Sequence, residues 1–335
     1  DTVCAGASVT FTATPVNAGL TPSYQWQVNG GDVGTNSATF VTSSLTNGAV
    51  VRCILTTPDT CVTKNKDTSN NIVMTIEPIV TPDVTIAVSP NDTVCVGDMV
   101  TFTATPVNGG TTPAYQWRVN GTNAGANSST FATSTLANND VVDCILTSSV
   151  TCVTKTKDTS TGITMNVRPK LTPDVQIVVL PNDTICAGTN VTFIATPFNG
   201  GPAPSYQWQV NGVNVGTNAT SYSSSTLTNG AVVRCIMTSS EPCVTKLMDT
   251  SNIIAMTVNP NLTPDVTITV SPNDTICVGT SVTFTATPVN GGTTPAYQWR
   301  VNGTNAGTNS STYVTTTLAN SDVVDVILTS SEVCV

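Results

Sequence analysis

The residues best placed to do chemistry in this 335-residue chain are its eleven cysteines. They recur at three positions of a repeating segment. The first position is held by Cys4, Cys95, Cys186 and Cys277, the second by Cys53, Cys144 and Cys235, and the third by Cys61, Cys152, Cys243 and Cys334. Thiols can form disulfides, bind metal or pack as small apolar groups in a core.

The fourth repeat indicates which cysteine position is dispensable. Its second position is Val326 instead of cysteine. A disulfide partner rarely changes to valine while its mate remains, whereas a buried thiol can. We therefore predict that the second-position thiols are free core residues and that the first position pairs with the third inside each repeat. The predicted bonds are Cys4–Cys61, Cys95–Cys152, Cys186–Cys243 and Cys277–Cys334.

Such bonds would have consequences for stability and location. Each would close a loop of roughly 60 residues and stabilise its domain by about 3–4 kcal/mol in the chain-entropy model. Disulfides in every repeat imply an oxidising, extracellular location. The alternative, a zinc site, lacks a fourth ligand because each repeat offers at most three isolated cysteines and the chain has no histidine.

The composition argues against several functions. Charged residues are 9% of the chain, and the net charge is −9. A nucleic-acid partner would need a basic face, which the sequence lacks. No apolar run approaches the ~18 residues of a membrane span, so we expect no membrane insertion in this region. Without histidine, a nucleophile motif, a phosphate loop or paired carboxylates, we expect neither catalysis nor a bound cofactor.

The tripeptide Tyr-Gln-Trp organises the repeat. Its tryptophans are Trp26, Trp117, Trp208 and Trp299, at equal steps of 91 residues. In a chain with so few aromatic residues, we expect each tryptophan to be a core anchor. The predicted domains are 1–78 with its first strand missing, 79–169, 170–260, and 261–335 with its last strand missing. We expect the chain to be an excerpt of a longer array.

Repeat 2 illustrates the strand pattern. Apolar and polar residues alternate over 83–88, 100–104, 114–119 and 130–133, and a strand containing Cys144 is expected over 141–147. Asn120-Gly121 is a strong hairpin signal, and 163–167 is expected to be the last strand. About seven short strands, one tryptophan and no helical pattern predict an all-β fold, an Ig-like β-sandwich.

The likeness to Ig-like domains extends to individual residues. Gly97 to Phe102 resembles the B strand, Trp117 stands where the C-strand tryptophan does, and Leu136 with Asp140 resembles the corner before the F strand. One departure matters. The B-strand cysteine is replaced by Ala104, with Ala13, Ala195 and Ala286 as its equivalents, so the usual disulfide between strands B and F is absent.

The outward positions of the two central strands alternate between repeats. We predict cross-strand pairs Arg118–Asp143 and Arg300–Asp325, with Gln27–Arg52 and Gln209–Arg234 in the odd repeats. Two interpretations remain open. Each is a minor sheet pair worth about 0.2–1 kcal/mol, or the alternation sets lateral or domain–domain contacts in an assembly.

The junctions between repeats read Pro-x-x-Thr-Pro-Asp and are expected to be short, semi-rigid spacers that give an extended rod. Asp83 and Asp92, with their equivalents, could hold Ca²⁺ at a junction, since carboxylates suit that ion. The alternative is that they are solvated turn residues, because no Asp-x-Asp loop occurs.

A threonine follows aspartate before each first-position cysteine, at Thr2, Thr93, Thr184 and Thr275. The sequence Asp-Thr-(Val/Ile) resembles the O-glycosylation signal of secreted Bacteroidetes proteins. The alternative interpretation is an Asx-turn at the start of an edge strand.

The whole repeat, with Ile/Val-Cys-x-Gly-x-x-Val-Thr-Phe and a later cysteine, resembles the Ig-like or PKD-like tandem repeats of very large Bacteroidetes cell-surface proteins. These include gliding-motility adhesins exported by the type IX pathway. The resemblance implies a non-catalytic stalk or adhesive fibre at the cell surface. Its expected partners are neighbouring repeats, surface polysaccharide or other copies of itself. The alternatives are the accessory repeats of a secreted polysaccharide-degrading enzyme and a self-assembling fibre subunit.

Overall fold

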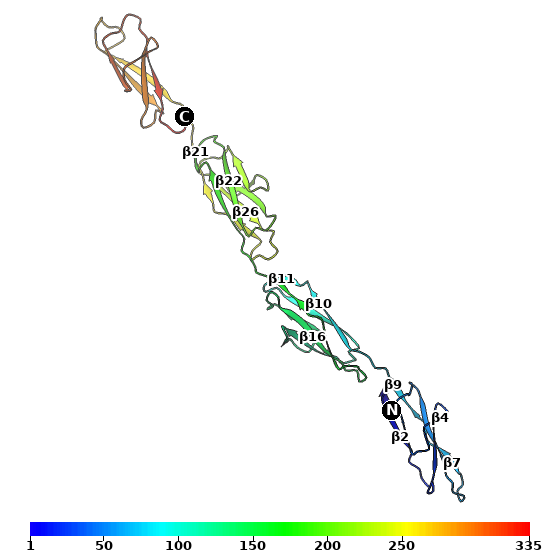
Figure 1. Ribbon diagram of the computed structural model, residues 1–335. Helices are drawn as coiled ribbons and strands as arrows, with labels where there is room; N and C mark the ends of the chain where they lie inside the picture. Colours follow the sequence, from blue (N-terminus) through cyan, green and yellow to red (C-terminus); the bar gives the residue numbers. More distant parts are fainter. The chain divides into compact units, whose positions relative to one another are not determined.

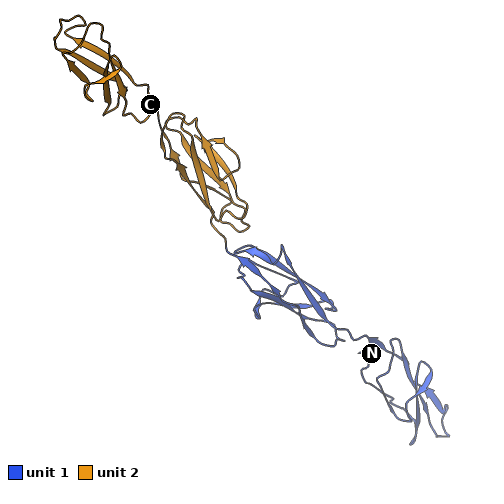
Figure 2. Ribbon diagram, turned by 45° about the horizontal axis from the view of Figure 1, so that its top comes forward, with its two compact units in different colours: residues 1–169 blue, residues 170–335 orange.

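The computed structural model describes residues 1–335 and contains strands without any helix (Figure 1). The all-β prediction is therefore confirmed. No helix of a length and apolar character suited to crossing a membrane is present. The chain divides into two compact units, Asp1–Pro169 with repeats 1 and 2, and Lys170–Val335 with repeats 3 and 4 (Figure 2).

The strands of unit 1 follow the repeat. In repeat 1 they are β1 (Thr2–Cys4), β2 (Val9–Thr12), β3 (Ser23–Val28), β4 (Gly31–Val33), β5 (Thr39–Thr42), β6 (Val50–Thr56), β7 (Lys66–Thr68), β8 (Ile72–Val73) and β9 (Thr75–Glu77). In repeat 2 they are β10 (Asp83–Ser89), β11 (Thr93–Cys95), β12 (Val100–Val107), β13 (Ala114–Val119), β14 (Thr122–Ala124), β15 (Thr130–Thr133), β16 (Val141–Thr147), β17 (Lys157–Thr159), β18 (Ile163–Thr164) and β19 (Asn166–Arg168).

The strands of unit 2 repeat the same order. In repeat 3 they are β20 (Asp174–Leu180), β21 (Thr184–Cys186), β22 (Val191–Phe198), β23 (Ser205–Val210), β24 (Val213–Val215), β25 (Ser221–Ser224), β26 (Val232–Thr238), β27 (Met248–Thr250), β28 (Ile254–Ala255) and β29 (Thr257–Asn259). In repeat 4 they are β30 (Asp265–Ser271), β31 (Val282–Val289), β32 (Ala296–Val301), β33 (Thr304–Ala306), β34 (Thr312–Thr315) and β35 (Val324–Thr329).

Repeat 2 has two main sheets that share one core. One has the order β10-β12-β15, and the other has the order β14-β13-β16-β17 with β18 also paired to β16. Their inward residues form a single apolar cluster that includes Phe102, Trp117 and Leu146. This is the arrangement of a β-sandwich, and it follows from strands in which every second residue is apolar.

The tryptophan is the centre of each core, as predicted. Trp117 has 0% of its surface exposed, and its ring lies 5.9 Å from that of Phe131 and 6.1 Å from that of Phe102. Its indole N–H donates to the carbonyl of Ser128 at 2.9 Å, so the buried polar atom is satisfied. Across the sheet it pairs with Cys144. Trp26, Trp208 and Trp299 are buried in the same way.

Most predicted strands of repeat 2 are confirmed, with two differences. The second strand, expected over 100–104, continues to Val107 because it pairs with β10 from Thr101 to Val107. The last strand, expected over 163–167, divides into β18 and β19 at the buried Met165. β19 leaves the sheet there and pairs in parallel with β11, a pairing that the local pattern did not indicate.

The Asn-Gly hairpin is confirmed between β13 and β14. Asn120 and Gly121 both have positive φ, at 51° and 76°. A two-residue turn of this kind matches the twist of the strands that it joins, and asparagine and glycine adopt it at the lowest cost. The turn therefore fixes the register in which Trp117 faces Ala124.

The core can be tested with a pair of substitutions in repeat 2. We expect Trp117→Ala to lower the free energy of unfolding by about 3–5 kcal/mol, because it leaves a large cavity between the sheets. Cys144→Val should change it by about 1 kcal/mol or less, since repeat 4 already carries Val326 opposite its tryptophan. Denaturant titration followed by circular dichroism measures both. Similar losses in the two variants would contradict the assigned roles.

Candidate functional site: the junction between successive repeats

The disulfides join one repeat to the next, so the predicted pairing within each repeat is wrong. Cys4 in repeat 1 bonds to Cys152 in repeat 2, and Cys186 in repeat 3 bonds to Cys334 in repeat 4. Both bonds span a sequence separation of 148. They exclude all four predicted bonds, Cys4–Cys61, Cys95–Cys152, Cys186–Cys243 and Cys277–Cys334.

The remaining cysteines fall into three groups. Cys95 and Cys243 are disulfide-bonded as well. The second-position residues Cys53, Cys144 and Cys235 are free and buried, as predicted. Cys61 and Cys277, which were expected to be bonded, are free and exposed. First-position and third-position cysteines are therefore disulfide partners, but the two cysteines of each bond belong to successive repeats instead of the same repeat.

The reason lies in where the short strand β1 runs. It pairs in parallel with β9, which places Cys4 opposite Glu77 at the end of repeat 1. The chain then enters the linker that leads to repeat 2. Cys4 consequently lies at the boundary of its own repeat, and the hairpin that carries Cys152 meets it from the other side of the junction.

Hydrogen bonds hold the linker beside the disulfide. Val80 forms a parallel bridge with Val153: its N–H donates to the carbonyl of Cys152 at 3.0 Å, and its own carbonyl accepts from Thr154 N–H at 2.9 Å. Asn108 donates its side-chain amide to the carbonyl of Thr81 at 2.8 Å. The linker is therefore fixed by backbone pairing in addition to the restricted torsions of its prolines.

Unit 2 shows the same contacts between repeats 3 and 4. The N–H of Leu262 donates to the carbonyl of Cys334 at 2.7 Å, and Asn290 donates to the carbonyl of Thr263 at 2.9 Å. Asn261, inside the linker, donates to the carbonyl of Ala187 in repeat 3 at 3.1 Å. Each unit thus contains one junction in which a disulfide runs beside a hydrogen-bonded linker.

The free core thiols have low reactivity. Burial raises the pKa of Cys144 and of Cys235 to about 11, and burial also raises the pKa of Cys53. A thiol reacts as its thiolate, so these groups are poor nucleophiles near neutral pH. They serve as small apolar residues beneath the tryptophans.

The predicted cross-strand pairs are confirmed. Arg118 donates Nε and Nη2 to the two carboxylate oxygens of Asp143 at 2.7 and 2.8 Å, and Arg300 binds Asp325 in the same way. In the odd repeats, Arg52 donates to Gln27 at 2.9 Å and Arg234 donates to Gln209 at 2.8 Å. All follow or precede inward residues along their strands and therefore lie on the outer face of a sheet.

The first strand of repeat 2 is anchored by an acidic side chain. Asp158 accepts a hydrogen bond from Val84 N–H at 3.2 Å and pairs with Lys155. The Lys155 hydrogen bond is the main reason why the pKa of Asp158 is lowered. Asp249 holds β20 in the same manner through Val175 N–H. The Asp83 side chain lies beside Asp158.

The other predicted sites have simple local structures. The N–H groups of Thr93, Thr184 and Thr275 donate to asparagine side chains two residues earlier, which is the Asx-turn alternative. Thr2, Thr184 and Thr275 are exposed and Thr93 is partly exposed, so they are accessible for glycosylation. No group of three or more metal-binding side chains gathers, at Asp83 and Asp92 or elsewhere.

Comparisons with known proteins add no assignment to this geometry. No protein-family model matches the chain, and no curated protein matches it either. The junction disulfides indicate an oxidising environment, as expected for an extracellular chain.

Disulfide mapping and thiol labelling test the pairing. Non-reducing proteolysis should yield peptides linking Cys4 to Cys152 and Cys186 to Cys334. Alkylation of the native chain at pH 8 should modify Cys61 and Cys277 rapidly, and Cys53, Cys144 and Cys235 only after denaturation. Recovery of a Cys4–Cys61 peptide from the native protein would contradict the assignment.

Acid stability tests the first-strand anchor. A carboxylate with a lowered pKa contributes stability above its ordinary pKa of 3.8, and this is lost as the pH falls through the lower folded value. We expect Asp158→Asn to cost about 1 kcal/mol at pH 7 and less at pH 2. Urea titrations at the two pH values measure this. Asp67→Asn is the matched control, since that side chain is 72% exposed, and an equal loss there would contradict the anchor.

Proposed function

We propose that the chain is a non-catalytic, load-bearing region of an extracellular surface protein, built from tandem Ig-like β-sandwich repeats that form an extended rod. The observation that supports this is the disulfide between successive repeats, Cys4–Cys152 in one unit and Cys186–Cys334 in the other. A bond inside one repeat would stabilise a single domain. A bond across a junction couples two domains and bypasses the linker between them.

The benefit of this arrangement is mechanical. Tension applied to the two ends of unit 1 passes from Cys4 to Cys152 through the disulfide, and the chain between them carries none of it. The protected segment spans 148 residues. A fully extended residue spans at most ~3.3–3.6 Å, so each bond withholds about 50 nm of chain from extension. A stalk that must keep its length under load needs this property.

The resemblance of the repeat to those of giant Bacteroidetes surface proteins supports the same proposal. Gliding-motility adhesins exported by the type IX pathway are the class that we propose. Threonine hydroxyls such as Thr184 are exposed, which leaves them accessible to the proposed O-glycosylation. Neighbouring repeats are the proposed partners, together with surface polysaccharide or further copies of the chain.

Single-molecule pulling tests the load-bearing role. The intact chain is held at its two ends and unfolded with its disulfides intact, and then again after complete reduction. Both bonds together withhold two segments of 148 residues, so we expect reduction to lengthen the unfolded chain by about 100 nm.

Two variants sharpen this experiment. Replacing both members of one bond, Cys4→Ser with Cys152→Ser, should lengthen the oxidised chain by an intermediate amount. Cys144→Val removes a thiol outside any disulfide and should leave both lengths unchanged. Equal extension before and after reduction would refute the load-bearing proposal.

A further inference from the structure

The outer surface of the sheet β20-β22-β25 in repeat 3 is apolar. Val178 and Leu180 point outward from β20, on either side of the inward Val179, and Ile194 lies opposite Val178 on β22. Val178 is 55% exposed, Leu180 is 53% exposed and Ile194 is partly exposed. Phe198 continues the outward row of β22 and is 50% exposed. We call Val178, Leu180, Ile194 and Phe198 the apolar face.

The equivalent surfaces of repeats 2 and 4 are small or polar at the first three of these positions. The residues there are Ala87, Ser89 and Thr103 in repeat 2, and Thr269, Ser271 and Thr285 in repeat 4. All six are exposed. The inward residues of β10, β20 and β30 have the same order Val-Ile-Val in all three repeats. The outward exchange in repeat 3 therefore does not serve its core.

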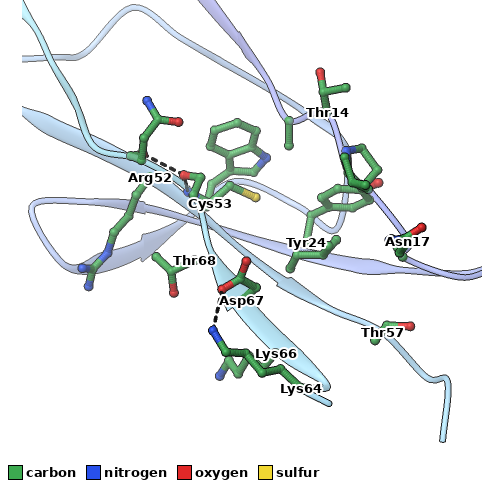
Figure 3. A pocket seen from close by; sticks show the side chains of 18 of the residues that line it. Thr14, Asn17, Tyr24, Arg52, Cys53, Thr57, Lys64, Lys66, Asp67 and Thr68 are labelled. Atoms are coloured by element: carbon green, nitrogen blue, oxygen red, sulfur yellow. Dashed lines mark hydrogen bonds and ion pairs between the residues drawn. The ribbon is translucent and has the colours of Figure 1, made fainter. Parts of the chain in front are cut away.

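Repeat 1 offers no surface of this kind. Its strand β2 pairs only with β5, and a cavity of about 840 Å³ lies beside β2. Figure 3 shows Tyr24 and Cys53 lining this cavity, with the Lys64–Asp67 ion pair at its edge. The apolar face thus occurs once among the four repeats.

The arrangement of the apolar face is that of a contact surface. An antiparallel sheet with one side on the core normally presents polar side chains on the other side. Isolated exposed apolar side chains are common, whereas adjoining ones mark interaction sites. Val178 and Ile194 are directly opposed, and Leu180 lies two residues from Val178 on the same side of the strand, so these three adjoin.

Two hydroxyl groups beside the apolar face satisfy each other. Thr192, opposite Leu180, shares a hydrogen bond of 2.8 Å with Ser223 on β25. The equivalent pair in repeat 2 is Thr101 and Ala132, which has a single hydroxyl. Burial of a polar group costs less when the group already has a hydrogen-bond partner. The surface around the apolar face can therefore be removed from water at a reduced cost.

The charges favour a second copy of the same chain as the occupant. Asp174 is the one charged residue among the outward positions of the three strands. Repeat 3 carries only −1 of the net charge of −9, because three basic residues oppose four acidic ones. They are Lys170, Arg234 and Lys246 against Asp174, Asp183, Glu241 and Asp249. Two copies that meet at repeat 3 therefore meet where their mutual repulsion is small.

The area of the sheet predicts a weak and reversible contact. The three strands have 7, 8 and 4 residues. With strands ~4.8 Å apart and a rise of ~3.3 Å per residue, they cover about 300 Å². A pair of such surfaces brings about 600 Å² into contact, in the range of transient complexes.

We propose that the apolar face of repeat 3 binds the same face of a second copy of the chain. The two sheets stack about 10 Å apart around a two-fold axis, as the two sheets inside one repeat do. One face in the chain gives a closed pair, because the same surface is used on both copies. The inference rests on the proposed function, which includes further copies of the chain among its partners, and it names the surface through which they meet.

Sedimentation velocity of the intact 335-residue chain tests the pair. Cys61 and Cys277 are free and exposed, so they are alkylated first to prevent a disulfide between copies. We expect the average sedimentation coefficient to rise from that of a monomer to that of a dimer between micromolar and millimolar concentration. A chain that stays monomeric over this range overturns the proposal. That result leaves the load-bearing role intact, since the pulling experiment is made on single molecules.

Substitutions taken from repeat 4 locate the contact. The variant Val178→Thr, Leu180→Ser, Ile194→Thr should raise the dissociation constant at least roughly tenfold, because three apolar side chains leave the interface. Repeat 4 has the same strands with these residues, so the fold is retained. The matched control is Val213→Thr, at a 67% exposed position on the other sheet of repeat 3. Equal weakening by the control would overturn the assignment.

Salt and methyl NMR give independent readouts. Added salt should strengthen the dimer, because it screens the repulsion between two chains of net charge −9 and leaves apolar contacts in place. The methyl signals of Val178, Leu180 and Ile194 should shift on dilution, and those of Ile86 in repeat 2 should not. A dimer that salt dissociates, or shifts confined to other repeats, would overturn the apolar face as the interface.

Discussion

The disulfide between repeats is the constraint on which the rest of the architecture depends. Because Cys4 bonds to Cys152, the first repeat cannot separate from the second even when the hydrogen bonds of the linker break. The same offset recurs at Cys186 and Cys334. A repeat is therefore not an independent domain in covalent terms. In both bonds the first cysteine of one repeat is joined to the third cysteine of the repeat that follows it.

Within each repeat, the core packed around the tryptophan is the same while the outward residues of the same strands differ. Trp117 and Trp208 occupy equivalent cores, yet the residues that follow them are Arg118 and Gln209, one paired with a carboxylate and the other with an arginine. Strand alternation separates the two faces, so an outward exchange leaves inward packing untouched. The same logic accounts for Val326, which replaces an inward thiol by an apolar side chain of similar size.

The sequence was sufficient to predict features that depend on the alternation of inward and outward residues along a strand. It was insufficient to predict contacts between one repeat and the next. The main strands, the buried tryptophans, the free thiols and the Arg118–Asp143 pair all follow from which residues face inward. The disulfides do not. First-position and third-position cysteines recur at one period, so pairing within a repeat and pairing across a junction give the same sequence pattern. The deciding element is β1, whose three residues pair in parallel with the distant β9 and carry no local signal.

The disulfide determines how much tension reaches the first strand of the following repeat. β10 is held by backbone bonds to β12 on one side and, on the other, by the side chain of Asp158. The linker over 78–82 leads directly into β10, so force transmitted through the linker would act first on this strand. The edge of β10 that does not face β12 is held by side-chain hydrogen bonds and has no backbone pairing. The bond from Cys4 to Cys152 encloses both the linker and β10. It therefore shields the strand that the linker would otherwise pull away, and the strand can be held by contacts that would be too weak without it.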